Sequence, residues 1–426
     1  MANNDTLELH KLLEQAEAFC QQQHYQDAVG LYTAVLDQTD PDTESSEIRA
    51  IRLMALREVG LMQRRSGQHE AALASYEQYR QEARDSRQQV VALTQLGQQY
   101  NSMGQQDLAL AKHEEALQLA ETLNYANGRA LAFLGIGGTC FFLGQYEDAI
   151  ANLRQALTLF TQLKDIDNLS RTWNWFGIVY MQLGAIDKSI NAYENALLLV
   201  REIGDLQTAI VLDNLGESYQ HLFDMEKALE YHQQGLELIK GIDLPTQLID
   251  FYRNMGVELC YLGQVEEGLV YLEQAMAMSR EYDQHSTVMQ SLYSLALAKI
   301  ENGDLEEGKQ YAEELLEITE ARSLRGKQAQ AMYLLGLYHQ ATGDFEKAQQ
   351  AWQQVLFFAH DTGQHNLLWQ VHSGLALISE SEALTRTHYR IAAEIIDQIV
   401  YPIEDNKLRN KFLNAPPIKA VLDQLK

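Results

Sequence analysis

The sequence predicts an all-α fold: a right-handed superhelical solenoid of antiparallel helix pairs, with about nine repeats, a degenerate tenth and a C-terminal cap. The first supporting observation is a ladder of small residues at steps of 44, 37, 40, 40, 39, 40, 40 and 40, which runs through Ala28, Ala72, Ala109, Ala149, Ser189, Ala228, Gly268, Gly308 and Ala348. Such a period is the signature of a repeat array, in which each unit packs only on its neighbours. The second is the scarcity of proline, five in 426 residues, because proline inside a helix costs about 3 kcal/mol.

The composition limits the kinds of partner. The formal net charge is −26, so most of the surface would repel phosphate backbones, and we expect no nucleic-acid binding. We interpret the acidity as a source of solubility, with a preference for basic or polar partners as the alternative. No stretch approaches the roughly 20 apolar residues that span a bilayer, and the first residues lack the pattern of a secretory signal. We therefore expect no membrane association and a cytoplasmic location.

The first repeat is expected at residues 1–40, followed by a loop at residues 41–47 that accounts for the step of 44. Ser45 or Ser46 is expected to cap the next helix, because a serine side chain at this position accepts a hydrogen bond from a free backbone N–H. Residues 48–363 then form a continuous repeat array, with no change in composition that would mark a domain boundary.

Each unit of the array is predicted to contain two helices and a tight turn. The first helix carries a small residue twelve positions before that of the second helix, at Gly97, Gly137, Gly177, Gly216, Gly256, Ala296 and Gly336. Matched small residues let the two helix backbones approach closely. The turn carries a glycine that accepts the left-handed conformation ending the first helix, at Gly67, Gly104, Gly144, Gly184, Gly263, Gly303 and Gly343.

The pattern decays past Gly363. Residues 364–401 are predicted to form a degenerate helix pair, with helices at 365–379 and 385–400. Residues 402–426 are predicted to be a C-terminal capping segment, because the last repeat would otherwise expose its hydrophobic face. A docking tail is the alternative.

The unit residues resemble tetratricopeptide repeats over about residues 6–360. The resemblance is carried by Leu96-Gly97, Tyr100, Gly104 and Ala109 in one unit, and by Leu215-Gly216, Tyr219 and Ala228 in another. The usual period of that family is 34, whereas the period here is 40. The longer form resembles the repeats of spindle-orientation adaptors, kinesin light chains and bacterial peptide-pheromone receptors. This resemblance implies peptide or protein binding without chemistry in the repeats.

No catalytic motif was found. The sequence contains no HExxH, CxxC, GxSxG or GxxxxGK[ST], so we expect no enzyme activity, no cofactor and no metal. The run from Gly135 to Thr139 mimics a phosphate loop, but it lies inside a predicted first helix. It indicates either close helix packing or a bare patch on the inner groove where a partner backbone could approach.

The resemblance also implies that the first helices line the inside of the superhelix. The partner-binding residues expected there are polar, amide-rich and aromatic: Arg171, Asn174, Trp175, Asp213, Asn214, Glu217, Gln220, His221, Arg253, Asn254, Tyr261, Tyr293 and Tyr333. Among them, Asn174, Asn214 and Asn254 form a ladder of amides that could each donate to and accept from a peptide backbone. Surface polarity with local capping is the alternative.

A second candidate surface is a concentration of arginines in the second unit, at Arg49, Arg52, Arg57, Arg64 and Arg65. Arginine pairs well with carboxylates and phosphates, so this patch could contact an acidic partner or another copy of the chain. The alternative is a solvated face paired with the protein's own acids.

These observations favour a non-catalytic scaffold or adaptor that binds a peptide or partner protein in a concave groove. The alternative is a peptide-sensing regulator that changes superhelix shape and acts on a separate effector protein. A third hypothesis, an enzyme with a site hidden in the groove, has only the absence of motifs against it. The sequence leaves the partner's identity and the oligomeric state open.

Overall fold

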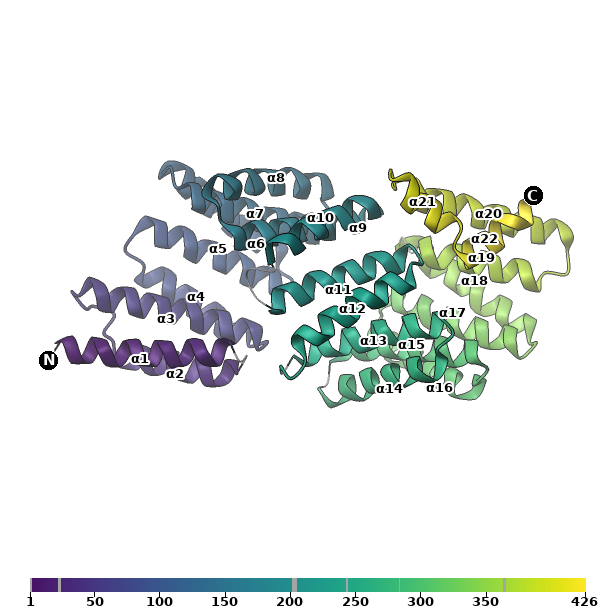
Figure 1. Ribbon diagram of the computed structural model, residues 1–426, viewed down its shortest axis with the longest axis horizontal. Coiled ribbons are helices and arrows are strands. Elements are labelled where there is room, and N and C mark those ends of the chain that lie inside the picture. Colours follow the sequence, from purple (N-terminus) through teal and green to yellow (C-terminus); the bar gives the residue numbers. More distant parts are fainter. Residues whose placement is uncertain (1, 22–23, 201–204, 243, 283, 363–364) are drawn as a thin grey trace. The chain divides into compact units, whose positions relative to one another are not determined.

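The computed structural model describes residues 2–21, 24–200, 205–242, 244–282, 284–362 and 365–426, and these residues form helices and no strand (Figure 1). Successive helices pack as pairs, and each pair packs on the next from α1 to α8 (residues 2–163) and again from α11 to α20 (residues 205–400). The prediction of an all-α solenoid of helix pairs is therefore confirmed. Within the described part of the chain, no helix combines the length and the apolar character that crossing a membrane requires.

The contacts divide the chain into two compact units. Unit 1 comprises Met1–Val179 with Leu198–Val200 and Gly241–Asp243, and unit 2 comprises Tyr180–Leu197, Arg201–Lys240 and Leu244–Lys426. The division falls inside a helix, α9 (Ile166–Gln182), where the sequence shows no change in composition.

Unit 1 contains four helix pairs and the greater part of α9. Its helices are α1 (Ala2–Gln21), α2 (Tyr25–Asp37), α3 (Ser46–Arg65), α4 (His69–Glu82), α5 (Ser86–Ser102), α6 (Gln106–Thr122), α7 (Ala126–Phe142) and α8 (Tyr146–Leu163). Of the two serines proposed as the cap of α3, it is Ser45 whose side chain accepts a hydrogen bond from the backbone N–H of Ile48.

Unit 2 continues the same pattern to the C-terminus. Its helices are α10 (Ile186–Val200), α11 (Asp205–His221), α12 (Met225–Ile239), α13 (Pro245–Tyr261), α14 (Val265–Glu281), α15 (His285–Asn302), α16 (Leu305–Ala321), α17 (Arg325–Ala341), α18 (Phe345–Thr362), α19 (His365–Ile378), α20 (Glu382–Val400), α21 (Asn406–Leu413), α22 (Pro416–Leu422) and a short 3-10 helix, η1 (Asp423–Leu425). The helices α19 and α20 correspond to the helix pair expected at residues 365–400.

The small residues of the first helices make room for bulky side chains of the second helices. In four repeats, a ring from the second helix lies over a glycine sixteen positions earlier, in the pairs Gly60–Tyr76, Gly97–His113, Gly216–His232 and Gly336–Trp352. A Cβ added to any of these glycines would lie only 2.1–2.6 Å from the ring. Backbones also approach closely, since a Cβ on Gly256 would lie 2.8 Å from the carbonyl oxygen of Gly268. The ladder of small residues therefore serves both close backbone contact and side-chain insertion.

The odd-numbered helices lie closer to one another than the even-numbered ones do. In unit 1, α1, α3, α5 and α7 contact each other in succession, and in unit 2 the same is true of α11, α13, α15, α17 and α19. The described even-numbered helices show no comparable succession of contacts. Each unit is therefore curved with its odd-numbered helices on the inner side.

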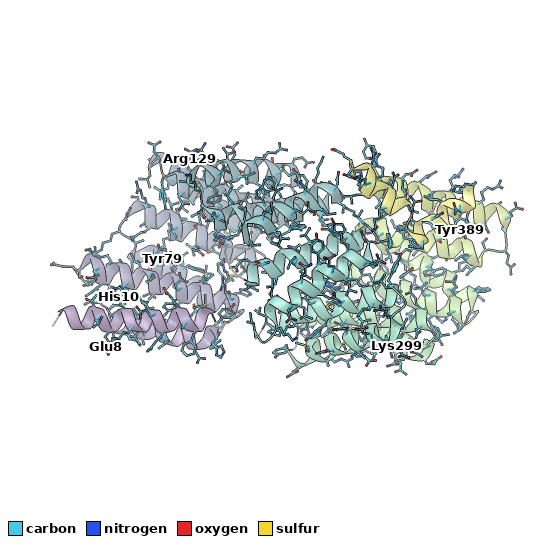
Figure 2. The ribbon with its side chains drawn as sticks, viewed as in Figure 1. Glu8, His10, Tyr79, Arg129, Lys299 and Tyr389 are labelled. Atoms are coloured by element: carbon cyan, nitrogen blue, oxygen red, sulfur yellow. The ribbon has the colours of Figure 1, made fainter. Side chains whose placement is uncertain are left out.

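Buried charges reinforce the stacking of pairs in unit 2. The Lys299 side chain on α15 lies 3.4 Å from Glu273 on α14 and 3.0 Å from Glu307 on α16 (Lys299 is labelled in Figure 2). Burial alone would lower the pKa of Lys299, but hydrogen bonds and charge from Glu307 and Glu273 outweigh it and raise that pKa. One lysine thus joins three successive helices.

One turn departs from the repeat pattern. Among the described residues, eight glycines have φ between 71° and 90°, and seven of them lie in turns within helix pairs, whereas the turn between α11 and α12 places Phe223 at φ 57°. This left-handed conformation costs a non-glycine residue about 1 kcal/mol, so another contact must stabilise the turn. The ring of Phe223 packs at 5.8 Å, centroid to centroid, from that of Phe412 in the C-terminal segment.

The end of the chain packs on the last helix pair. Both α22 and η1 contact α20, and the side chains of Ile403, Ile418 and Val421 are buried. The segment predicted as a cap therefore lies against the end of the array.

Candidate partner-binding site

The candidate residues from the groove prediction all lie on odd-numbered helices, but they fall into two groups. Arg171, Asn174 and Trp175 are on α9, within unit 1. The others belong to unit 2 and lie on α11, α13, α15 and α17.

The centre of the unit 2 group is a buried ion pair between α12 and α13. The Nδ1 atom of His232 lies 2.7 Å from Oε1 of Glu258, and both side chains are fully buried. The other ring nitrogen of His232, Nε2, lies 3.4 Å from a carboxylate oxygen of Asp213 on α11. The imidazole therefore bridges carboxylates from the helices on either side of it in the chain.

Two amides complete this network. Asn254 Nδ2 donates to Asp213 Oδ1 at 3.2 Å, and Gln220 Nε2 donates to Glu258 Oε1 at 2.8 Å. Asn254 is only 1% exposed, so its amide is used inside the protein and does not face a partner. The amide-ladder prediction is therefore wrong for Asn254, because the carboxylate of Asp213 takes the donor that a peptide would need.

Burial controls the protonation of this network. It raises the pKa of Asp213 to about 7, and the negative charge of Glu217 adds to the effect. Burial also raises the pKa of Glu258, against the opposing influence of His232. Burial alone would lower the pKa of His232, but the hydrogen bond and charge of Glu258, with the charge of Asp213, outweigh it and raise that pKa. The three groups therefore keep their protons to a higher pH than the same groups do in water.

The surface above the network is polar and carries both signs of charge. Arg253 Nη2 on α13 lies 3.9 Å from Glu217 Oε1 on α11 and 3.6 Å from Asp250 Oδ1. Asn214 is half-buried, and His221 is exposed at the end of α11. These side chains project from two adjacent inner helices that the buried network holds together.

The three tyrosines differ in exposure. Tyr261 is 40% exposed and its ring lies 6.3 Å from that of Phe223. Tyr293 is half-buried, whereas Tyr333 is 8% exposed and belongs to the core around Trp352. The prediction of a partner contact is therefore wrong for Tyr333, because its ring is buried in packing between helices.

In unit 1, the glycine-rich run of α7 is packed. A Cβ on Gly135 would lie 2.3 Å from the His113 ring, and one on Gly138 would lie 3.2 Å from Trp175. The Trp175 ring in turn lies 5.8 Å from Phe141. Close packing explains the glycines, and the alternative of a bare patch is wrong because side chains cover them.

The arginines of α3 do not form one surface. Arg52 is 5% exposed and binds both carboxylate oxygens of Glu82 at 2.7 and 3.0 Å, together with the carbonyl oxygens of Leu36 and Thr39. Arg52 therefore joins α2, α3 and α4 and cannot face a partner, which corrects the patch prediction at this residue. Arg49 donates to the Thr43 carbonyl, and Arg57 pairs with Glu58 at 2.7 Å.

Arg64, Arg65 and Arg171 form a different group. Among the described residues none of the three has an ion pair, and Arg64 donates instead to Gln98 at 2.8 Å. Burial lowers the pKa of Arg64, and the charges of Arg171 and Arg65 lower it further. The guanidinium groups therefore repel one another, while the carboxylates of Asp167 and Asp165 oppose the lowering of the pKa of Arg171.

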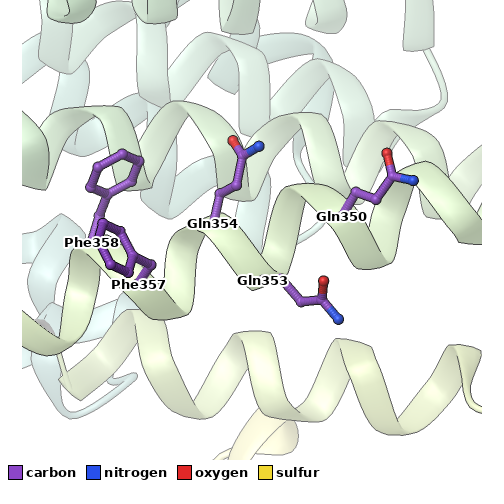
Figure 3. A pocket seen from close by; sticks show the side chains of 5 residues that line it. All are labelled: Gln350, Gln353, Gln354, Phe357 and Phe358. Carbon is purple, nitrogen blue, oxygen red and sulfur yellow. The ribbon is translucent and has the colours of Figure 1, made fainter.

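A shallow hollow of about 480 Å³ lies away from these residues, on α18. It is lined by Gln350, Gln353, Gln354, Phe357 and Phe358, which Figure 3 shows along one side of the helix. The Phe357 side chain is exposed. This hollow lies on an even-numbered helix and contains no residue that the sequence indicated.

The sequence did not indicate His232 or Glu258 as part of the site. His232 stands where other units place Tyr76, Leu153, Leu272 or Trp352, so it looked like a packing residue. Glu258 follows the small residue Gly256 by two positions, where α11 has Ser218. The signal that could have identified the site was Glu258 itself, a carboxylate at a position of the helix that faces the core.

Comparison with protein families gives a consistent result. Models described as tetratricopeptide repeat match residues 13–87, 88–162, 168–240, 290–322 and 330–356. A curated relative, the uncharacterized protein ycf37 of Guillardia theta, is 31% identical over 114 residues. That match covers 26% of this chain and 58% of the relative.

Several solved structures share the fold over most of the chain. The apo form of RapI aligns with a TM-score of 0.64 at 14% identity, covering 82% of this chain and 98% of the other. A Rap protein complexed with competence and sporulation factor gives 0.62 at 14% identity, with 84% and 100% covered. The apo form of the quorum sensor NprR from B. thuringiensis gives 0.58 at 16% identity, with 84% and 98% covered.

Proposed function

The chain belongs to the tetratricopeptide-repeat family, and from that premise we propose that it is a non-catalytic scaffold that binds a peptide or partner protein along the inner side of unit 2. The family models that match all describe repeats. The partner is a polypeptide, because the candidate surface offers amides, one arginine, carboxylates and an exposed tyrosine ring in place of a closed pocket.

The observation that carries this proposal is the support beneath the surface residues. Asn214, Glu217 and Arg253 project from α11 and α13, and these helices are joined through Asp213, Asn254, His232, Gln220 and Glu258. Binding groups that are held in place before association lose less conformational entropy when the partner arrives. A fixed arrangement of donors and acceptors suits recognition of an extended segment.

A peptide-sensing regulator is the second candidate. It is favoured by the likeness in fold to the quorum sensor NprR and to the Rap protein whose structure contains competence and sporulation factor. The two candidates share the binding face and differ in whether binding changes the curvature of the repeats. Small-angle scattering with and without the captured partner distinguishes them, since a scaffold keeps its dimensions.

The proposal is tested by quantitative affinity capture from native cells with two charge-neutral double variants. Glu217→Gln with Arg253→Gln removes the pair on the inner helices, and Glu237→Gln with Lys240→Gln removes an exposed pair on α12. We expect the inner variant to reduce capture about tenfold, since a hydrogen bond to a charged group contributes about 1.5–3 kcal/mol. Equal capture by both variants would refute the assignment of the face.

A further inference from the structure

The segment that follows α20 returns to the beginning of unit 2. Lys188 Nζ near the start of α10 lies 2.7 Å from Glu404 Oε1, and Asp187 Oδ2 accepts hydrogen bonds from the backbone N–H groups of Glu404 and Asp405, each at 2.9 Å. Pro402 approaches Gly184 in the preceding turn. These contacts join residues more than 210 positions apart in the chain, at the two ends of unit 2.

A second set of contacts links the same segment to the turn between α11 and α12. Lys411 forms an ion pair with Asp224, and the buried ring of Phe412 packs on Phe223. Phe223 in turn packs on Tyr261, an exposed tyrosine at the end of the inner helix α13. The segment therefore contacts the ends of the helices that carry the candidate binding face.

The turn at Phe223 is shaped by this contact. The corresponding turns with a glycine at positive φ have no side chain at that position. Phe223 instead adopts φ 57° and packs its ring against that of Phe412. A phenylalanine is strained in this conformation, and its ring packs on the rings of Phe412 and Tyr261. The turn that has phenylalanine in place of glycine is thus the turn that contacts Phe412, near the C-terminal end of unit 2.

The contacts between residues 402–415 and the beginning of unit 2 are more exposed than the packing in the core of the array. The side chains of Lys188 and Glu404 are 42% and 70% exposed, and an exposed ion pair contributes little stability, whereas Lys411 pairs with an Asp224 carboxylate that is only 11% exposed. A hollow of about 420 Å³ also remains beside Phe223 and Lys411. By contrast, the following α22 buries Ile418 and Val421 against the last helix pair. Within residues 402–415 the buried apolar side chains are Ile403, Phe412 and Ala415, and Phe412 is the one that packs on the turn between α11 and α12.

We propose that residues 402–415 form a strap that fastens the last helix pair of unit 2 to its first, and that release of the strap opens the inner face to a partner. The proposal deepens the proposed function and rests on it for the identity of the face that opens. Because the strap joins the two ends of a curved array, its attachment through Phe412 and Phe223 helps to fix the curvature.

The test compares the full-length chain with Phe223→Gly and Phe412→Ala by hydrogen exchange and small-angle scattering. Glycine is the residue that the other turns use, so Phe223→Gly relieves the backbone and removes only the ring contact. Asp423→Asn is the control, since Asp423 lies in the same terminal segment but pairs with Lys426, beyond the proposed strap. Both measurements are made without a partner, so they are independent of whether the proposed binding function is correct.

In the two release variants we expect amide exchange at residues 403–413 to rise at least about tenfold, with α20 and α22 unchanged, and the radius of gyration to increase. The control should match the wild type in both measurements. Unchanged exchange in Phe223→Gly would overturn the strap, because the ring contact would not hold it. Faster exchange with an unchanged radius of gyration would overturn the gating, because the strap would not fix the curvature.

Discussion

Two histidines occupy the same position of their repeats, and their neighbours shift their pKa values in opposite directions. His113 and His232 each fill the space above a first-helix glycine. Burial lowers the pKa of His113 to about 4, and neither of its ring nitrogens has a hydrogen-bond partner. His232 is equally buried, but the pKa of its ring is raised by the adjoining Glu258 and Asp213.

The difference follows from two substitutions in the repeat. The positions that hold Asp213 and Glu258 around His232 correspond, by the same spacing of 19 before and 26 after, to Thr94 and Thr139 around His113. Threonine carries no charge to stabilise an imidazolium, so burial alone decides the pKa of His113. Because the two rings occupy the same position, the carboxylates around His232 are not required by the packing of the repeat itself.

The network makes the stability of the protein depend on pH. Asp213 has a pKa of about 7 in the folded state against 3.8 ordinarily, so the folded state binds the proton more tightly and stability falls as pH rises from about 4 to 7. The raised pKa of Glu258 acts in the same direction. The raised pKa of His232 stabilises the fold below its ordinary value of 6.5, and this stabilisation is lost as pH rises through the folded value.

Asp213→Asn keeps a side-chain acceptor for Asn254 but removes the buried charge. We expect the variant to be more stable than the wild type at pH 8, by about 1–2 kcal/mol once partial exposure is allowed for, and to differ little at pH 5. Urea unfolding of both proteins at the two pH values measures this. A loss of stability at pH 8 would show that the charge of Asp213 is needed.

At the scale of helices, each pair is held by a bulky side chain of the second helix placed over a small residue of the first. Trp352 is the largest case, because its fully buried indole lies between Gly336 on α17 and Gly374 on α19. A Cβ on Gly336 would lie 2.1 Å from the indole Nε1. One side chain therefore joins three helices across the boundary between two repeats.

Gly336→Ala should destabilise the protein by about 1–3 kcal/mol, because the rigid Trp352 ring cannot move without disturbing both neighbouring helices. The matched change Gly30→Ala should stabilise it by up to about 1 kcal/mol, because Gly30 lies inside α2 with open space around its Cα. Thermal unfolding of the two variants checks the opposite signs. Destabilisation of similar size in both would mean that the insertion of Trp352 is not the cause.

At the scale of the whole chain, the period of 40 residues predicted the helix pairs and their turns, because each element depends on residues nearby in sequence, and the helices α19 and α20 correspond to the pair expected where that period decays. The sequence could not predict contacts between helices that depend on the exact reach of a side chain. Arg52 turned inward to Glu82, and Asn254 turned to Asp213, although both types of residue are common on surfaces.

The long-range features were beyond sequence reasoning for a related reason. The missing turn glycine at Phe223 could be seen in the sequence, but its meaning required knowledge that Phe412, 189 positions later, returns to the same place. Likewise the division of the contacts into two units falls inside α9 without any change in composition. Curvature accumulates over many repeats, and no single repeat encodes it.

The central claim, that the inner side of unit 2 binds a polypeptide partner, is tested most directly by photocrosslinking in native cells. Benzoylphenylalanine replaces Glu217 on α11 in one protein and Glu237 on α12 in another, so the same probe is carried by adjacent inner and outer helices. We predict that the partner crosslinks from position 217, through a single short segment of its chain, and not from position 237. Crosslinking of the same partner from 237 alone, or equally from both positions, would contradict the account.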